Sequence, residues 1–126
     1  MFSASLKENS RFLRFWRLRE VSPVTSRYSI EEITRNLKTA GHELRLANLL
    51  TLTEIVSDAD IRLIPSYIKI AAKDAPILAT SIGASVDYLV TGDTKHFAHL
   101  YGKTVSGVHI LTSADFIDLH EDRLGE

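Results

Sequence analysis

The sequence predicts an α/β fold, in which a parallel sheet is covered by helices. Short apolar runs of strand length alternate along the chain with segments of helical apolar spacing. The run Tyr88–Val90 is apolar without a break, as in a strand that is buried on both faces of a parallel sheet. No internal repeat, low-complexity tract or linker divides the chain, so we expect residues 1–126 to form a single domain.

The N-terminal part predicts a helix followed by a short strand. Residues 6–19 carry an apolar stripe beside a narrow basic face, which indicates an amphipathic helix. Val21–Thr25 predicts a strand that contains Pro23. Because proline cannot donate to a strand ladder, we expect this strand to be irregular or at a sheet edge.

Two helices are predicted next. Ser29 and Glu32 have the spacing of a capping box, which predicts a helix from Ser29 to about Leu37. Gly41 interrupts this pattern. Apolar residues at helical spacing then predict a second helix over Glu43–Val56.

The remaining elements include a strand at Ile61–Ile64, which ends at Pro65, and a short helix at Ser66–Ala72. Near the C-terminus, Val108–Leu111 predicts a strand and Ser113–Leu119 a helix. Strands and helices that alternate at this spacing are typical of a parallel α/β sheet.

The segment from Lys73 to Asp93 is the most informative part of the chain. Asp74 followed two residues later by Pro76 is a helix start, since proline is tolerated in the first turn of a helix. The strand Tyr88–Val90 follows that helix and ends at Gly92-Asp93. In a parallel α/β unit, the N-terminus of a helix and the C-terminal end of the next strand lie at the same sheet edge, where ligands bind.

Composition excludes several classes of function. The chain has no cysteine, which excludes disulfides and thiolate chemistry and fits a cytoplasmic location. No apolar run reaches the length of a membrane span, so no membrane association is expected. The formal net charge of −1 argues against nucleic-acid binding through bulk positive charge, and any contact with RNA has to be local.

Three carboxylates are predicted to converge on one sheet edge. Glu32 lies in the first turn of a helix that follows a strand, so topology places it with Asp74 and Asp93. Carboxylates about 4 Å apart repel by about 1 kcal/mol in water and by about 4 kcal/mol at an effective dielectric near 20, so such a cluster requires a cation or shared protons. A divalent metal meets this need. Each residue also has an ordinary role, as a capping-box residue, an N-cap and a turn residue respectively.

Three sequence motifs resemble the PIN-domain family, and in particular the small bacterial and archaeal PIN proteins that act as toxins with antitoxin partners. The resemblance covers nearly the whole chain and implies a three-layer parallel sheet with helices on both faces. The motifs are Thr25-Ser26-x-Tyr28-x-Ile30-Glu31-Glu32-Ile33, Lys73-Asp74-Ala75-Pro76-Ile77-Leu78-Ala79 and Asp87-Tyr88-Leu89-Val90-Thr91-Gly92-Asp93.

The resemblance implies a metal-dependent endoribonuclease. Glu32, Asp74 and Asp93 would hold Mg²⁺ or Mn²⁺, and a metal-activated water would attack a phosphodiester of RNA. Glu32 is preferred to Glu31 because an apolar residue follows it, and Thr91 matches a hydroxyl residue near the metal. An antitoxin protein and a second copy of the chain, as a homodimer, are the implied protein partners.

Basic side chains supply candidate contacts with the RNA backbone. Lys95 and His96 follow Asp93 closely and are candidate phosphate ligands. Arg11 and Arg14 lie on one stripe of the predicted helix over residues 6–19. The ordinary alternative in each case is a solvated surface side chain.

The chain departs from the family pattern at its start. PIN domains open with a central strand that ends in an Asp-x-Asn motif, whereas this chain begins at Met1-Phe2-Ser3-Ala4, inside that pattern. We therefore expect the first central strand to be missing or truncated and the first acid to be absent. A start site placed too far downstream is the preferred explanation, and a truncated, inactive copy is the second.

Two other functions compete with ribonuclease activity. The same fold without the first acid predicts a catalytically inactive module that binds RNA or a protein. A phosphoacceptor signalling domain also uses acids at a sheet edge, but it requires a paired acidic motif after the first strand, and the sequence has none.

Overall fold

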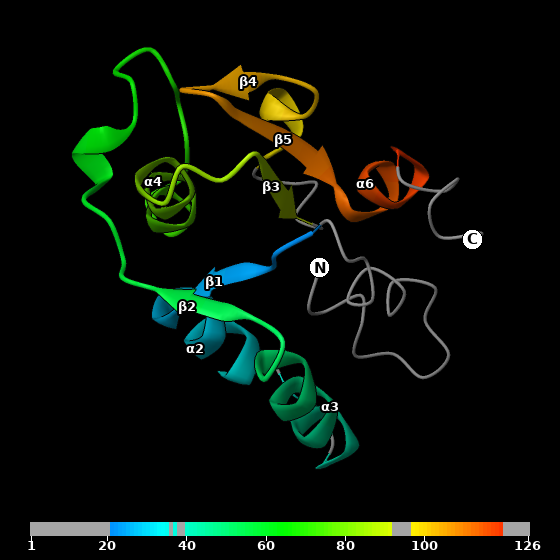
Figure 1. The fold of residues 1–126 in the computed structure, drawn as a ribbon. Helices are drawn as coiled ribbons and strands as arrows, with labels where there is room; N and C mark the ends of the chain where they lie inside the picture. Colours follow the sequence, from blue (N-terminus) through cyan, green and yellow to red (C-terminus); the bar gives the residue numbers. More distant parts are fainter. Residues whose placement is uncertain (1–20, 36, 38–39, 92–96, 120–126) are drawn as a thin grey trace.

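The computed structural model describes residues 21–35, 37, 40–91 and 97–119, and these residues form a mixed α/β structure (Figure 1). The α/β class is therefore confirmed. The helix predicted over residues 6–19 lies outside the described residues. In chain order the elements are β1 (Val24–Ser26), α2 (Arg27–Arg35), α3 (Ala40–Leu50), β2 (Glu54–Val56), the 3₁₀ turn η2 (Ile61–Leu63), α4 (Ala75–Gly83), β3 (Tyr88–Thr91), the 3₁₀ turn η3 (Ala98–Leu100), β4 (Thr104–Val105), β5 (Val108–Thr112) and α6 (Ser113–Leu119).

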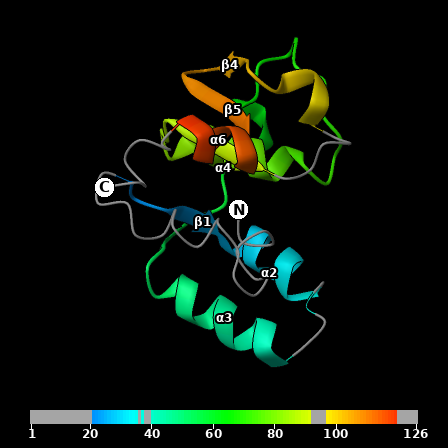
Figure 2. The ribbon, with the colours of Figure 1, turned by 90° about the vertical axis from the view of Figure 1, so that its right-hand side faces the viewer.

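The described strands form two small sheets where one continuous sheet was predicted. β1 pairs in parallel with β2, with Thr25 opposite Ile55. In the second sheet β5 lies between β3 and β4, parallel to β3 and antiparallel to β4. In both Figure 1 and Figure 2, α2 and α3 lie on one side of β1, and α4 and the second sheet lie on the other.

The boundary between α3 and β2 corrects the predicted helix over Glu43–Val56. The helix ends at Leu50, and the hydroxyl groups of Thr51 and Thr53 donate to carbonyl groups of its last turn at 2.6 and 2.8 Å. The backbone N–H of Glu54 then donates to the carbonyl of Pro23 at 2.9 Å, which begins the pairing of β2 with β1.

The predicted strand at Ile61–Ile64 is also wrong, because this segment forms η2. The Asp60 carboxylate accepts from the Arg62 backbone N–H at 2.8 Å and from its guanidinium at 2.7 Å, which closes a tight turn. These hydrogen bonds hold the pKa of the Asp60 carboxyl below its usual value. The predicted helix at Ser66–Ala72 is absent as well, since these residues form turns and irregular backbone.

The predicted elements from Asp74 onward are confirmed, and β4 is an addition. α4, β3, β5 and α6 lie within a residue or two of their predicted positions. β4 and β5 form a hairpin through Ser106 and Gly107, whose φ angles of 48° and 86° fit a two-residue type I′ turn.

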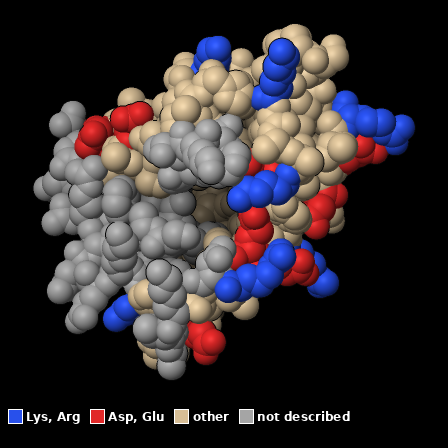
Figure 3. Space-filling view, turned by 180° about the vertical axis from the view of Figure 1, so that it is seen from behind, with Lys and Arg blue, Asp and Glu red and all other residues tan. Residues whose placement is uncertain are grey.

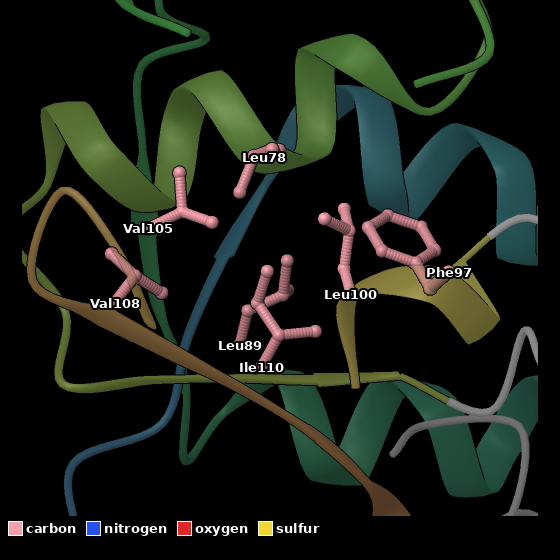
Figure 4. Close-up of a cluster of buried hydrophobic side chains, with 7 residues drawn as sticks. All are labelled: Leu78, Leu89, Phe97, Leu100, Val105, Val108 and Ile110. Carbon is pink, nitrogen blue, oxygen red and sulfur yellow. The ribbon is translucent and has the colours of Figure 1, made fainter. Parts of the chain in front are cut away.

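The main hydrophobic core lies between α4 and the three-stranded sheet (Figure 4). Leu78 of α4 and Ile110 of β5 are both 0% exposed. The other buried members come from β3, η3 and the β4–β5 hairpin: Leu89, Phe97, Leu100, Val105 and Val108. A second, smaller cluster joins α2 and α3 through Leu46 and Leu49, which pack with Ile33, Leu37 and Leu50.

We predict that Leu78→Ala lowers the free energy of unfolding by about 2–5 kcal/mol, because it leaves a cavity at a fully buried position. Urea denaturation measures the change. Leu44→Ala is the matched control, since Leu44 is 65% exposed and its truncation is expected to change stability by less than about 0.5 kcal/mol. Equal losses in the two variants would contradict the position of this core.

Candidate acidic site

The candidate site forms where the end of β1 meets the N-terminus of α4. Ser26 is the last residue of β1, and its Oγ accepts from the backbone N–H of Ser29 at 3.2 Å. This N-cap contact starts α2 at Arg27, two residues before the predicted start. Tyr28, in the first turn of α2, donates its hydroxyl hydrogen to the carbonyl of Lys73, the residue before Asp74.

Neither predicted acid on this edge serves as a helix cap through its side chain. Glu32 lies in the second turn of α2, so the predicted capping box between Ser29 and Glu32 is wrong. Asp74 is the N-cap residue of α4, but its carboxylate makes no capping hydrogen bond. The ordinary capping role therefore accounts for neither carboxylate.

Asp74 is buried and Glu32 is half-buried. The Asp74 side chain is 2% exposed, whereas the neighbouring Glu31 of α2 is exposed. Burying an ionised carboxylate costs several kcal/mol unless hydrogen bonds, a cationic group or a metal compensate. Of the two glutamates of α2, Glu32 is thus the less exposed.

Tyr28 lies within the electrostatic field of both acids. Partial burial raises the pKa of the Tyr28 phenol most, the carboxylates of Glu32 and then Asp74 raise it further, and Arg35 lowers it. The two carboxylates both act on Tyr28 although they are far apart in sequence. Sequence reasoning placed Tyr28 in a motif without giving it a role, although its i, i+4 spacing to Glu32 was visible.

The strand ends of the second sheet contribute hydroxyl groups. Thr91, a predicted site residue, ends β3 opposite Thr112 of β5, and its carbonyl accepts from the Tyr101 hydroxyl at 3.1 Å. The Thr112 Oγ1 caps α6 by accepting from the Asp115 N–H at 3.0 Å. The next side chain, Ser113, is buried, and its Oγ has no hydrogen-bond partner among the residues that the structure describes.

The remaining predicted site residues cannot be placed in this geometry. Asp93, Lys95, His96, Arg11 and Arg14 lie outside the described residues. Within residues 21–35, 37, 40–91 and 97–119, no three His, Asp or Glu side chains are grouped so that they could hold a metal ion. The described part of the acidic site thus consists of Glu32 on α2 and Asp74 at the start of α4, and Tyr28 connects these two helices.

A hollow of about 410 Å³ lies at the other end of α4 and is separate from this site. Its lining includes Val24, Val56, Gly83 and the exposed acid Asp58. Because α4 begins at Ala75 and this hollow adjoins its last residue, Gly83, the hollow does not contain Asp74.

Charge on the described surface is mixed. Figure 3 shows acidic and basic side chains interspersed over the described part of one face, around a depression. This distribution matches the small net charge of the chain.

No helix among the described residues has the length and apolar character that a membrane span requires.

We predict that Glu32→Gln lowers the pKa of Tyr28, because the substitution removes a negative charge that disfavours the phenolate. An NMR titration of ring-labelled tyrosine measures this pKa. Glu31→Gln changes the same charge at the exposed neighbouring position and is the control. Equal shifts in the two variants would contradict the proximity of Glu32 to Tyr28.

Comparison of the chain with protein-family models, curated proteins and solved structures found no match. A functional assignment therefore rests on the geometry of the chain itself. Glu32 and the buried Asp74 come from separate helices, and Tyr28 connects these helices.

Proposed function

We propose that this protein is a metal-dependent endoribonuclease of the PIN type and the toxin of a toxin-antitoxin pair. The observation that carries the proposal is the buried carboxylate of Asp74, which makes no capping hydrogen bond and acts on Tyr28 together with Glu32. Two acids that come together from separate helices repel each other, and a bound cation would offset this repulsion.

Glu32, Asp74 and Asp93 are the proposed ligands of Mg²⁺ or Mn²⁺. Both ions prefer oxygen ligands, and a partly buried pair of carboxylates fits that preference. In the sequence, Asp93 follows Thr91, the last residue of β3, by two positions. When bound, the ion supplies a Lewis acid for a phosphate group and a more acidic water.

The residues of the chain divide the remaining tasks. Glu32 and Asp74 would hold the cation, and Asp74 would do so from a buried position. Thr91 places a hydroxyl group at the end of β3. In the proposal Lys95, His96, Arg11 and Arg14 bind the RNA backbone, which provides the local positive charge that the whole chain lacks.

The finer fold assignment belongs to the same proposal. In a three-layer PIN-like sheet, β1 and β3 would flank a central strand position. Among the described residues β1 pairs only with β2, and β3 pairs only with β5, so each has an edge without a described partner strand. A cytoplasmic location, an antitoxin partner and a homodimer are further parts of the proposal.

We predict that the chain binds Mn²⁺ and that both Asp74→Asn and Glu32→Gln weaken this binding at least tenfold. Each substitution removes one anionic ligand while keeping the size of the side chain. Isothermal titration calorimetry measures the dissociation constant. Glu31→Gln is the matched control on α2 and should bind Mn²⁺ like the wild type.

The same titration decides against the proposal if wild-type protein releases no more heat than Asp74→Asn. That outcome would favour the alternative function, a PIN-like module that binds RNA or a protein without catalysis.

We further predict that the protein cleaves single-stranded RNA with Mg²⁺ or Mn²⁺ and that Asp93→Asn lowers the rate at least a hundredfold, or by about 2.7 kcal/mol in barrier height. Gel analysis of a labelled RNA with excess metal measures the rate. EDTA should abolish cleavage in the wild type. Cleavage that persists in EDTA, or that is equally fast in Asp93→Asn, would exclude this mechanism.

A further inference from the structure

Tyr28 joins two helices that come from distant parts of the chain. It lies in the first turn of α2, and its hydroxyl donates to the carbonyl of Lys73, 45 positions later. Lys73 directly precedes Asp74, the N-cap residue of α4. The contact therefore ties the start of one helix to the start of the other.

This contact fixes the peptide unit that leads into Asp74. A peptide unit is planar, so its carbonyl and its N–H group move together. The carbonyl of the Lys73–Asp74 unit accepts from Tyr28, and its N–H donates to the carbonyl of Ala71 at 2.9 Å. Both polar ends of the unit are thus held, and the Asp74 Cα is attached to it.

The other side of Asp74 is held by α4. The Asp74 carbonyl accepts from the backbone N–H groups of Ile77 at 3.1 Å and Leu78 at 3.3 Å. Leu78 is fully buried in the main core. The backbone of Asp74 is therefore fixed before and after the residue, and Tyr28 supplies the one side-chain contact in this set.

Tyr28 also shares a face of α2 with Glu32. The two residues are four positions apart on α2, so they lie on the same face of the helix, one turn from each other. Because Tyr28 contacts the residue before Asp74, this face of α2 is the one that meets the start of α4. The influence of both acids on the Tyr28 phenol agrees with this arrangement.

We propose that Tyr28 is a positioning residue of the acidic site, whose hydroxyl holds the Lys73–Asp74 peptide so that Asp74 stays opposite Glu32. The inference rests on the proposed function, because it assumes that these two acids bind a divalent cation. The hydroxyl proton of Tyr28 is committed to the Lys73 carbonyl. Tyr28 therefore acts through Asp74 and not on the substrate.

The test is the Mn²⁺ affinity of Tyr28→Phe, which keeps the ring and removes the hydroxyl. We expect the dissociation constant measured by calorimetry to rise about threefold to tenfold, as for the loss of one hydrogen bond. Tyr67→Phe is the matched control, since Tyr67 is 76% exposed, and its affinity should stay that of the wild type. Urea denaturation without metal measures the stability of each variant separately.

A purely structural role predicts a different pattern. Tyr28→Phe would then lose stability yet bind Mn²⁺ with the wild-type dissociation constant, and this result would overturn the inference. It differs from failure of the proposed function, in which the wild type itself binds no Mn²⁺ and the positioning role is overturned with it.

A second measurement on the wild type needs no substitution and can overturn the inference even if Tyr28→Phe does not fold. Substoichiometric Mn²⁺, which is paramagnetic, should broaden the ring NMR signal of Tyr28 before those of Tyr67, Tyr88 and Tyr101. Broadening of Tyr67 to the same degree as Tyr28 would show that the cation does not bind beside Tyr28, and the inference would be wrong.

Discussion

The packing of α4 against the three-stranded sheet is the constraint on which the acidic site depends. Leu78 and Asp74 are one turn apart, the first 0% and the second 2% exposed. At the other end of the helix, a Cβ added to Gly83 would lie only 3.0 Å from the Cβ of Ala59. Thr80 accepts from the Ala59 N–H at 3.0 Å. α4 is thus held at both ends. Burial of Leu78 in the core therefore also fixes where the Asp74 carboxylate lies.

The two carboxylates belong to helices that pack on cores of different size. Asp74 precedes α4, which packs on the larger core, whereas α2, which carries Glu32, has no buried residues. Among the described residues, α2 packs on a smaller cluster with two buried side chains, Leu46 and Leu49. The Tyr28 contact with Lys73 connects α2 to the start of α4. If a cation binds both acids, it adds a second link, and its binding energy then also stabilises the docking of α2.

The sequence predicted those elements whose signals are local. Asp74 with Pro76 marks a helix start within three residues, and the apolar run at Tyr88 marks a strand by composition alone. Both positions were confirmed, but burial on both faces was not: Leu89 is the buried residue of β3, and Tyr88 is 37% exposed. β4 was missed although its signal was also local: Ser106-Gly107 between two valines is a type I′ hairpin sequence, in which the two φ angles are positive.

Errors arose where distant residues or side-chain contacts decide the structure. The helical apolar spacing continues through Glu54–Val56, but pairing with β1, a non-local contact, makes this segment a strand. Asp60 converts an apolar run at Ile61 into a turn by binding the Arg62 backbone. Apolar spacing also does not encode which strands pair, so it could not predict that the described strands divide into two sheets.

The carboxyl groups of the site were predicted from topology. Whether they serve only as helix caps could be decided only from the capping contacts that the structure shows. An N-cap side chain stabilises a helix by about 1 kcal/mol when it accepts a backbone hydrogen bond. Asp74 makes no such bond and is buried, and Glu32 is displaced from the capping position because Ser26 starts α2. Helix capping through their side chains therefore does not explain why acids occupy these positions, and the cation proposed to bind between the two helices would account for both.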